Sequence, residues 1–95
     1  MNCVDKNSTL PFAGQDFYLG LDVHKRNWKV TIRMNHMELK TFSMNPNPPE
    51  LLRHLQRTYP GGFYHSVYEA GFCGFWIHRQ LVELGIDNRI VNAAD

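Results

Sequence analysis

Phe17-Tyr18-Leu19-Gly20-Leu21-Asp22 is a nearly continuous apolar run that ends on an acidic residue. Such a run is typical of a strand that is covered on both faces, as in the middle of an α/β sheet. A carboxylate that leaves water at the end of a core strand costs free energy unless it has a polar partner or a metal ion. The run therefore predicts a central strand, and it makes Asp22 a candidate functional residue.

A clear alternation of apolar and polar residues follows this run. Trp28, Val30, Ile32 and Met34 alternate with polar residues over 28–34, which predicts a strand with one buried face. Residues 38–43 form a weaker third strand. Because the connections between these three segments are short, we expect a three-stranded antiparallel meander.

Residues 47–50 predict the start of the first helix. Asn47 can act as the N-cap, Pro48 is favoured at the first helical position, and Glu50 completes a capping-box spacing. Apolar residues then recur on one helical face. The helix ends before the Pro-Gly-Gly sequence at 60–62.

The second half of the chain adds a strand, a helix and a strand. Residues 63–70 and 86–91 have strand composition, and residues 71–74 lead into the helix between them. The apolar stripe of that helix comprises Cys73, Trp76, Ile77, Leu81 and Leu84. The order β-β-β-α-β-α-β predicts an α/β fold: a mixed sheet with helices packed on it, in which the last two strands are parallel.

Length and composition predict a small globular protein. The 95 residues are 43% hydrophobic and 20% charged, which suffices for one domain. We expect residues 1–15 to form a flexible leader and residues 16–95 to form the domain. A net charge of +1 gives no support of its own for a nucleic-acid partner. The absence of a long apolar run argues against a membrane span, and two widely spaced cysteines fit a reducing, cytoplasmic setting.

A second acid, Glu69, stands near the end of the fourth predicted strand. If that strand lies parallel to the first, Asp22 and Glu69 end neighbouring strands about 4.8 Å apart. Two carboxylates at that spacing repel each other unless they are protonated or bridged by a cation, and Mg²⁺ or Mn²⁺ is the natural choice. Phosphoryl transfer is the chemistry that such a site serves. Because Phe63 and Val67 share a strand face with Glu69, we also expect this acid to be buried.

Two short motifs resemble those of a known family. Gly20-Leu21-Asp22-Val23-His24-Lys25 resembles the first acidic motif of the DEDD transposases of bacterial insertion sequences, the family that includes the Piv invertase. Tyr68-Glu69-Ala70-Gly71 resembles the second motif. The resemblance extends from about Phe17 to Asp95.

This resemblance implies a ribonuclease H-like, RuvC-like fold. It also implies that Asp22 and Glu69 are catalytic residues, the first two of four acids that bind Mg²⁺ or Mn²⁺. The other two acids of the family lie further downstream, so we expect this chain to be the truncated N-terminal portion of a bacterial, cytoplasmic DNA transposase and to be inactive alone. DNA is the partner that the resemblance implies, and some members are linked to a guide RNA.

Several other residues have two interpretations. Lys25, Arg26 and Lys29 could contact DNA phosphates, but a solvated charged face is the more common role of such residues. Trp28 and Trp76 lie on apolar stripes and are expected in the core rather than as base-stacking platforms.

Two further functions compete with the transposase. The first is an actin-like or sugar-kinase-like nucleotide-binding lobe, which shares this superfold. Its phosphate-binding hairpin needs small residues where this chain has Val23-His24-Lys25, and micromolar ATP binding would favour it. The second is a non-enzymatic remnant that self-associates as a homo-oligomer through exposed apolar residues, among them Phe72, Phe75 and Val82.

Overall fold

The computed structural model describes residues 12–70 and 75–92. The predicted order β-β-β-α-β-α-β is confirmed, and the strand limits differ from the expected ones by one residue or none. The elements are β1 (Asp16–Val23), β2 (Trp28–Met34), β3 (Met37–Met44), α2 (Pro48–Thr58), β4 (Phe63–Ala70), α3 (Trp76–Glu83) and β5 (Asp87–Asn92).

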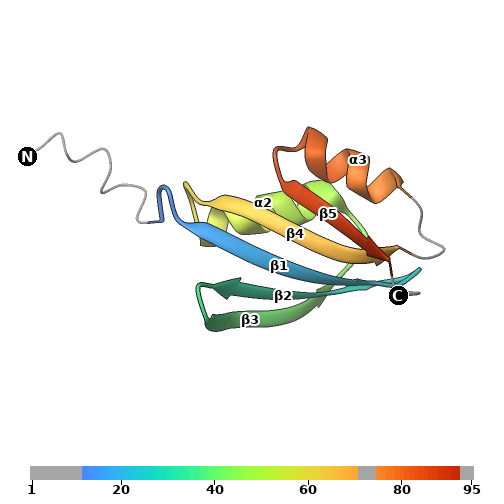
Figure 1. Ribbon diagram of the computed structural model, residues 1–95, viewed down its shortest axis with the longest axis horizontal. Coiled ribbons are helices and arrows are strands. Elements are labelled where there is room, and N and C mark those ends of the chain that lie inside the picture. The colour runs from blue at the N-terminus through green and yellow to red at the C-terminus, as the bar shows by residue number, and fades with distance from the viewer. Residues whose placement is uncertain (1–11, 71–74, 93–95) are drawn as a thin grey trace, which may run out of the picture.

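The strands form one five-stranded sheet in the order β3-β2-β1-β4-β5 (Figure 1). β2 is antiparallel to both β1 and β3, whereas β4 is parallel to both β1 and β5. The fold prediction is therefore confirmed: this is an α/β mixed sheet with the strand order of a ribonuclease H-like core. The topology places β1 at the centre of the sheet.

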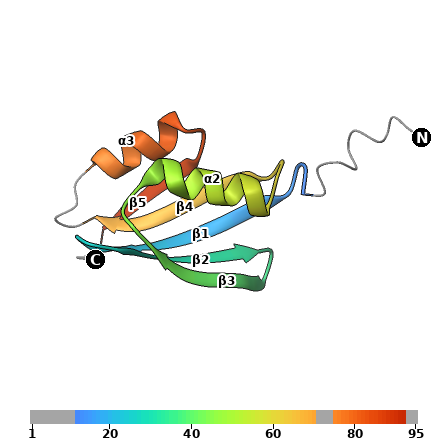
Figure 2. The ribbon, with the colours of Figure 1, turned by 180° about the vertical axis from the view of Figure 1, so that it is seen from behind.

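Helices α2 and α3 lie on the same face of the sheet (Figure 2). The core forms between this face and the helices, and Trp28 is one of its largest members, with 1% of its surface exposed. Tyr64 links β4 to the end of α2, because its hydroxyl donates a hydrogen bond to the backbone carbonyl of Tyr59, just beyond that helix. The other core residues are Phe17, Leu19, Leu21, Val30, Ile32, Leu51, Leu55, Tyr68, Ile77, Leu81 and Ile86.

The opposite face of the sheet is uncovered by described residues, which corrects one prediction about β1. Burial alternates along β1: Phe17, Leu19 and Leu21 point into the core, whereas Tyr18 and Asp22 are exposed. The expectation of a strand covered on both faces was wrong here, because α2 and α3 pack on one side only. The run looks continuously apolar in the sequence because Tyr18 and Gly20, which point away from the core, carry no charge.

The helix signals at residues 47–50 are confirmed in detail. Asn47 has an extended backbone, and its side-chain oxygen accepts a hydrogen bond from the Glu50 backbone N–H at 3.0 Å. Pro48 is the first helical residue. This bond satisfies one of the free N–H groups at the start of α2, an effect that stabilises a helix by about 1 kcal/mol.

Helix α3 buries a narrower stripe than the sequence predicts. Ile77 and Leu81, one turn apart, are buried, whereas Trp76 is 39% exposed. The assignment of Trp76 to the core was wrong, because it precedes the buried stripe by one residue and turns away from the sheet. Cys73, the first member of the predicted stripe, lies outside the described residues.

A buried polar network ties α3 to the sheet. Ser66 Oγ of β4 donates to Asn88 Oδ1 of β5 at 2.6 Å, and Asn88 Nδ2 lies 2.9 Å from His78 Nδ1 of α3. Buried polar groups are costly unless they are paired. The network therefore fixes how α3 lies on the sheet.

Residues just before β1 contact the core and the turn that precedes β4. Residues 12–15 fall in the expected leader, yet they form a turn in which Gly14 N–H donates to Gly61 O at 3.1 Å. Phe12 packs edge-on against Phe17 and Tyr59. Within the described residues, no helix is long and apolar enough to cross a membrane.

Candidate functional site

The two acids singled out by the sequence end neighbouring parallel strands. Asp22 is the second-last residue of β1, and Glu69 is the second-last residue of β4. In the β1–β4 register, Leu21 is the partner of Tyr68, so Asp22 and Glu69 follow at the same level. Because side chains alternate along both strands, the two acids lie on the same, uncovered face. The structure thus brings together two residues that are far apart in sequence.

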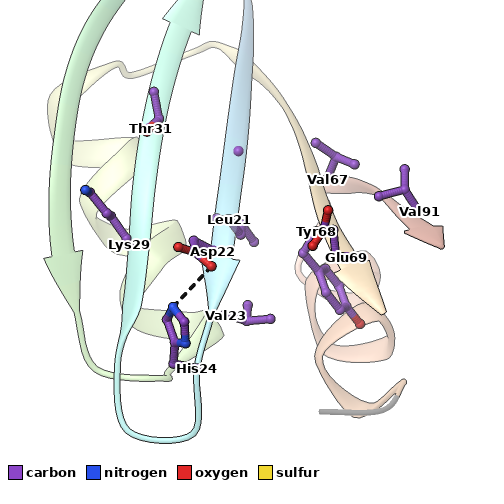
Figure 3. Close-up of a pocket in the computed structure, with 11 residues that line it drawn as sticks. Leu21, Asp22, Val23, His24, Lys29, Thr31, Val67, Tyr68, Glu69 and Val91 are labelled. Carbon is purple, nitrogen blue, oxygen red and sulfur yellow. Dashed lines mark ion pairs between the residues drawn. The ribbon is translucent and has the colours of Figure 1, made fainter. Parts of the chain in front are cut away.

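A shallow hollow of about 710 Å³ surrounds this strand end (Figure 3). Asp22 and Glu69 lie on its two sides, on β1 and β4 respectively. Gly20 widens it, because nothing lies within 4 Å of the position that its Cβ would occupy. The lining residues are Gly20, Leu21, Asp22, Val23, His24, Lys29, Thr31, Val67, Tyr68, Glu69 and Val91.

Asp22 has a partner on its own hairpin. His24 Nε2 lies 3.2 Å from Asp22 Oδ1, and 66% of the Asp22 side chain is exposed. The hairpin is closed by a hydrogen bond from His24 N–H to Asn27 O at 3.0 Å. An ion pair this exposed contributes little to stability. Its effect is to orient the Asp22 carboxylate while leaving it open to solvent.

Glu69 is exposed, so the prediction that it is buried was wrong. Phe63 and Val67, its neighbours on the same strand face, are also exposed. The residues that β4 buries are the alternate ones, Tyr64, Ser66 and Tyr68. Among residues 12–70 and 75–92, Glu69 has no ion-pair partner.

The donor set at the hollow fits a hard divalent cation that keeps much of its water. Mg²⁺ is commonly bound through only one or two carboxylates, with water completing its coordination. Asp22 and Glu69 supply two such groups, but no group of three or more His, Cys, Asp or Glu residues that could hold a metal occurs in the described part of the chain. The pair thus offers two carboxylates on one face, fewer than the ligands of a complete metal site.

The basic residues predicted as phosphate contacts lie at or near this edge. Lys29 lines the hollow and is the cross-strand neighbour of Asp22. Lys25 and Arg26 lie in the β1–β2 turn and do not line it. All three are exposed, which is compatible both with contacts to DNA and with a solvated charged face.

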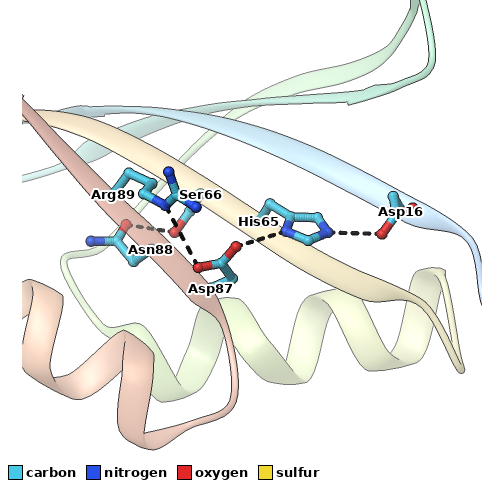
Figure 4. Close-up of polar contacts among 6 residues, drawn as sticks. All are labelled: Asp16, His65, Ser66, Asp87, Asn88 and Arg89. Carbon is cyan, nitrogen blue, oxygen red and sulfur yellow. Dashed lines mark hydrogen bonds and ion pairs between the residues drawn. The ribbon is translucent and has the colours of Figure 1, made fainter.

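A second polar cluster lies at the other end of the same face and was not predicted. His65 of β4 lies between two carboxylates: its Nε2 is 2.8 Å from Asp16 Oδ1, and its Nδ1 is 3.1 Å from Asp87 Oδ2 (Figure 4). Its ring also stacks on Tyr18, with ring centroids 5.0 Å apart. Both ring nitrogens can donate only in the protonated imidazolium. The cluster therefore ties β1, β4 and β5 together when His65 is charged.

We expect His65 to make stability depend on pH. The hydrogen bond with Asp16 raises the pKa of His65 above its usual 6.5; burial opposes this rise, and Asp87 reinforces it. A raised pKa in the folded state gives stabilisation that is complete below the unfolded-state pKa of about 6.5 and is lost as pH rises through the folded-state value. Relative to His65→Gln, the wild type should be more stable by about 1 kcal/mol below pH 6.5, and this gain should disappear as the pH rises through the raised pKa of His65, as measured by urea unfolding.

The same cluster offers an internal check by NMR. Asp16→Asn should lower the titration midpoint of His65, because it removes the strongest of the effects that raise this pKa. A wild-type midpoint at or below the usual pKa of 6.5 would contradict the assignment.

Comparison of the sequence with protein-family models and with curated proteins gives no match. A functional conclusion about this chain therefore depends on the geometry of the described residues and on the resemblance of the two motifs.

Proposed function

We propose that this chain carries two of the four metal-binding acids of a bacterial transposase or recombinase, an enzyme that cleaves and transfers DNA strands in the cytoplasm. The observation that carries the proposal is the placement of Asp22 and Glu69 at the ends of adjacent parallel strands, on one face and in one hollow. Ligand sites of open α/β sheets tend to lie at the carboxyl ends of their strands. The two motifs that resemble the DEDD family contain these same two acids.

Each residue has a defined role in this proposal. Asp22 and Glu69 hold Mg²⁺ or Mn²⁺, which would stabilise the charge that develops on the oxygens of a phosphodiester. His24 orients Asp22 through their 3.2 Å contact. Lys29, beside Asp22 on β2, offers a positive charge to the DNA backbone, and Lys25 and Arg26 extend this charge along the hairpin.

The test is a Mn²⁺ titration followed by NMR, in which paramagnetic broadening detects even a weak site. We expect broadening centred on residues 20–23 and 68–69, and we expect both Asp22→Asn and Glu69→Gln to abolish it at both strands. Glu83→Gln is the control, because it removes one exposed carboxylate from α3, outside the hollow. Broadening that is spread over all surface acids, or that persists at both strands in the two site variants, would contradict a shared site.

Because two acids make only half of the family's site, the chain alone should leave DNA uncleaved in the presence of Mn²⁺. The assay is incubation of the purified chain with supercoiled plasmid. Nicking that Asp22→Asn abolishes would show that these two acids suffice and would overturn this expectation.

A further inference from the structure

The uncovered face of the sheet is a broad surface of mixed character. Parallel strands such as β1, β4 and β5 generally occur in sheets covered on both faces. Here α2 and α3 cover only one face. The other presents exposed apolar side chains at Tyr18, Phe63, Val67 and Val91.

The register of the strands orders this face into levels. Tyr18, His65 and Asp87 are Cα partners across β1, β4 and β5 and form one level. The next level on the same face consists of Gly20, Val67 and Arg89. A protruding aromatic ring thus lies next to a position without a side chain, and an acid lies next to a base.

The level of Gly20 is hollow. A depression of about 580 Å³, lined by Tyr18, Gly20, Val67 and Arg89 among others, adjoins the hollow at the acid pair, and both include Gly20. Tyr18 beside it is 48% exposed. An open position and a protruding ring on adjacent levels are the two halves of a knob-and-hole contact.

We propose that a second copy of this chain packs on the uncovered face, sheet against sheet. The two copies are related by a twofold axis that lies between the two sheets, runs perpendicular to the strands, and crosses them midway between these two levels. Such an axis exchanges the levels, so that β1 faces β1 and β5 faces β5. Tyr18 of each copy enters the hollow above Gly20 of the other. Asp87 of each copy then faces the partner's Arg89.

The charges of the face fit this arrangement. Arg89 is 77% exposed and touches Asp87 of its own chain only at 3.9 Å, so its guanidinium is available for a second carboxylate. The one like-charge approach joins Asp16 to the partner's Asp22. These acids lie at the rim, and each has a histidine of its own chain as partner, His65 and His24 respectively. Stacked sheets lie about 10 Å apart with strand directions within about 30°, a geometry that the long Arg89 side chain can follow.

The size of the face suits a weak dimer. Five strands spaced about 4.8 Å apart, with about seven residues at 3.3 Å each, give a flat footprint of roughly 550 Å² per copy. A standard stable interface buries about 800 Å² per partner. Projecting side chains raise the buried area above the footprint, so the interface lies at the small end of specific interfaces, as expected of a weak and reversible dimer.

Sedimentation equilibrium of the 95-residue chain, from about 5 to 500 µM, tests the proposal. We expect a monomer–dimer equilibrium, weakened at least roughly tenfold by Arg89→Asp, because the partner's Asp87 then faces a like charge. Tyr18→Asp should weaken it as much. Arg53→Asp is the matched control. It makes the same charge change at an exposed position of α2, on the other side of the sheet, and should leave the equilibrium unchanged.

One competing surface is tested by the same method. Phe75, Trp76 and Val82 form an exposed apolar patch on and beside α3, so Val82→Asp should have no effect if the sheet face is the interface. A monomer at every concentration would overturn the proposal. So would a dimer that Val82→Asp dissociates while Arg89→Asp does not.

The readout is mass without added metal, so a failure here is distinguishable from a failure of the proposed function. Because the twofold arrangement brings Asp22 and Glu69 opposite the partner's Asp16 and Phe63, the dimer covers the acid pair, and only the monomer presents it to DNA.

Discussion

Replacing Trp28 with alanine should lower the free energy of unfolding by about 3–5 kcal/mol. Trp28 is almost fully buried at the start of β2, where it pairs with Val23 of β1. Its removal leaves a cavity beneath the hairpin that carries Asp22 and His24. Small domains have a total stability of about 5–15 kcal/mol, so this one substitution should remove a large part of it. Urea unfolding followed by circular dichroism measures the loss.

The chain contains its own control for this experiment. Trp76 is the only other tryptophan, and it is 39% exposed at the start of α3. Trp76→Ala should therefore cost clearly less than Trp28→Ala, because 39% of the Trp76 surface is already in contact with water, compared with 1% for Trp28. Equal losses for the two variants would contradict the outward orientation of Trp76 on α3.

Gly62→Ala should destabilise the protein by about 1–3 kcal/mol, although it adds only a methyl group. A Cβ at this position would lie 2.6 Å from Cε1 and 2.7 Å from Cδ1 of Phe17. The Phe17 ring cannot yield easily, since it is fully buried and stacked on Tyr59 with centroids 4.6 Å apart. Differential scanning calorimetry should show a clear fall in the melting temperature.

Gly20→Ala is the matched control and should not destabilise the monomer; both variants are compared at concentrations low enough that the dimer proposed above is dissociated. No atom lies within 4 Å of its Cβ position, and the residue lies within β1. Because glycine in a strand costs about 0.5–1 kcal/mol relative to alanine, this variant should be neutral or slightly stabilised. A fall in melting temperature equal to that of Gly62→Ala would show that contact with Phe17 is not the cause.

The elements of the fold were predictable because each has a strong local signal. The alternation over 28–34 gives β2 to the residue, and Asn47 with Pro48 gives the start of α2. What the sequence could not give is which face each helix covers. That depends on how the connections place α2 and α3, and it explains the errors at β1 and at Glu69. Trp76 failed for a local reason, a shift of one residue from the buried stripe.

The two polar sites on the uncovered face, the acid pair and the His65 cluster, also differ in how far the sequence predicts them. Asp22 and Glu69 could be paired from sequence because each stands near the end of a recognisable strand, and only the parallel β1–β4 order had to be inferred. The cluster around His65 draws Asp16, His65 and Asp87 from three strands. Its detection requires the register of all three, and no spacing in the sequence reveals that register.

The pairing of β1 with β4 also has a consequence for the order of folding. The β1–β2 and β2–β3 pairs are hairpins that close short turns, which form in microseconds in isolated peptides. Strand β4 can join β1 only after the chain has closed the long loop through β2, β3 and α2, and such non-local pairing is slow. Asp22 thus acquires Glu69 as its neighbour late in folding, so a chain that stalls at the meander carries one acid of the pair without the other.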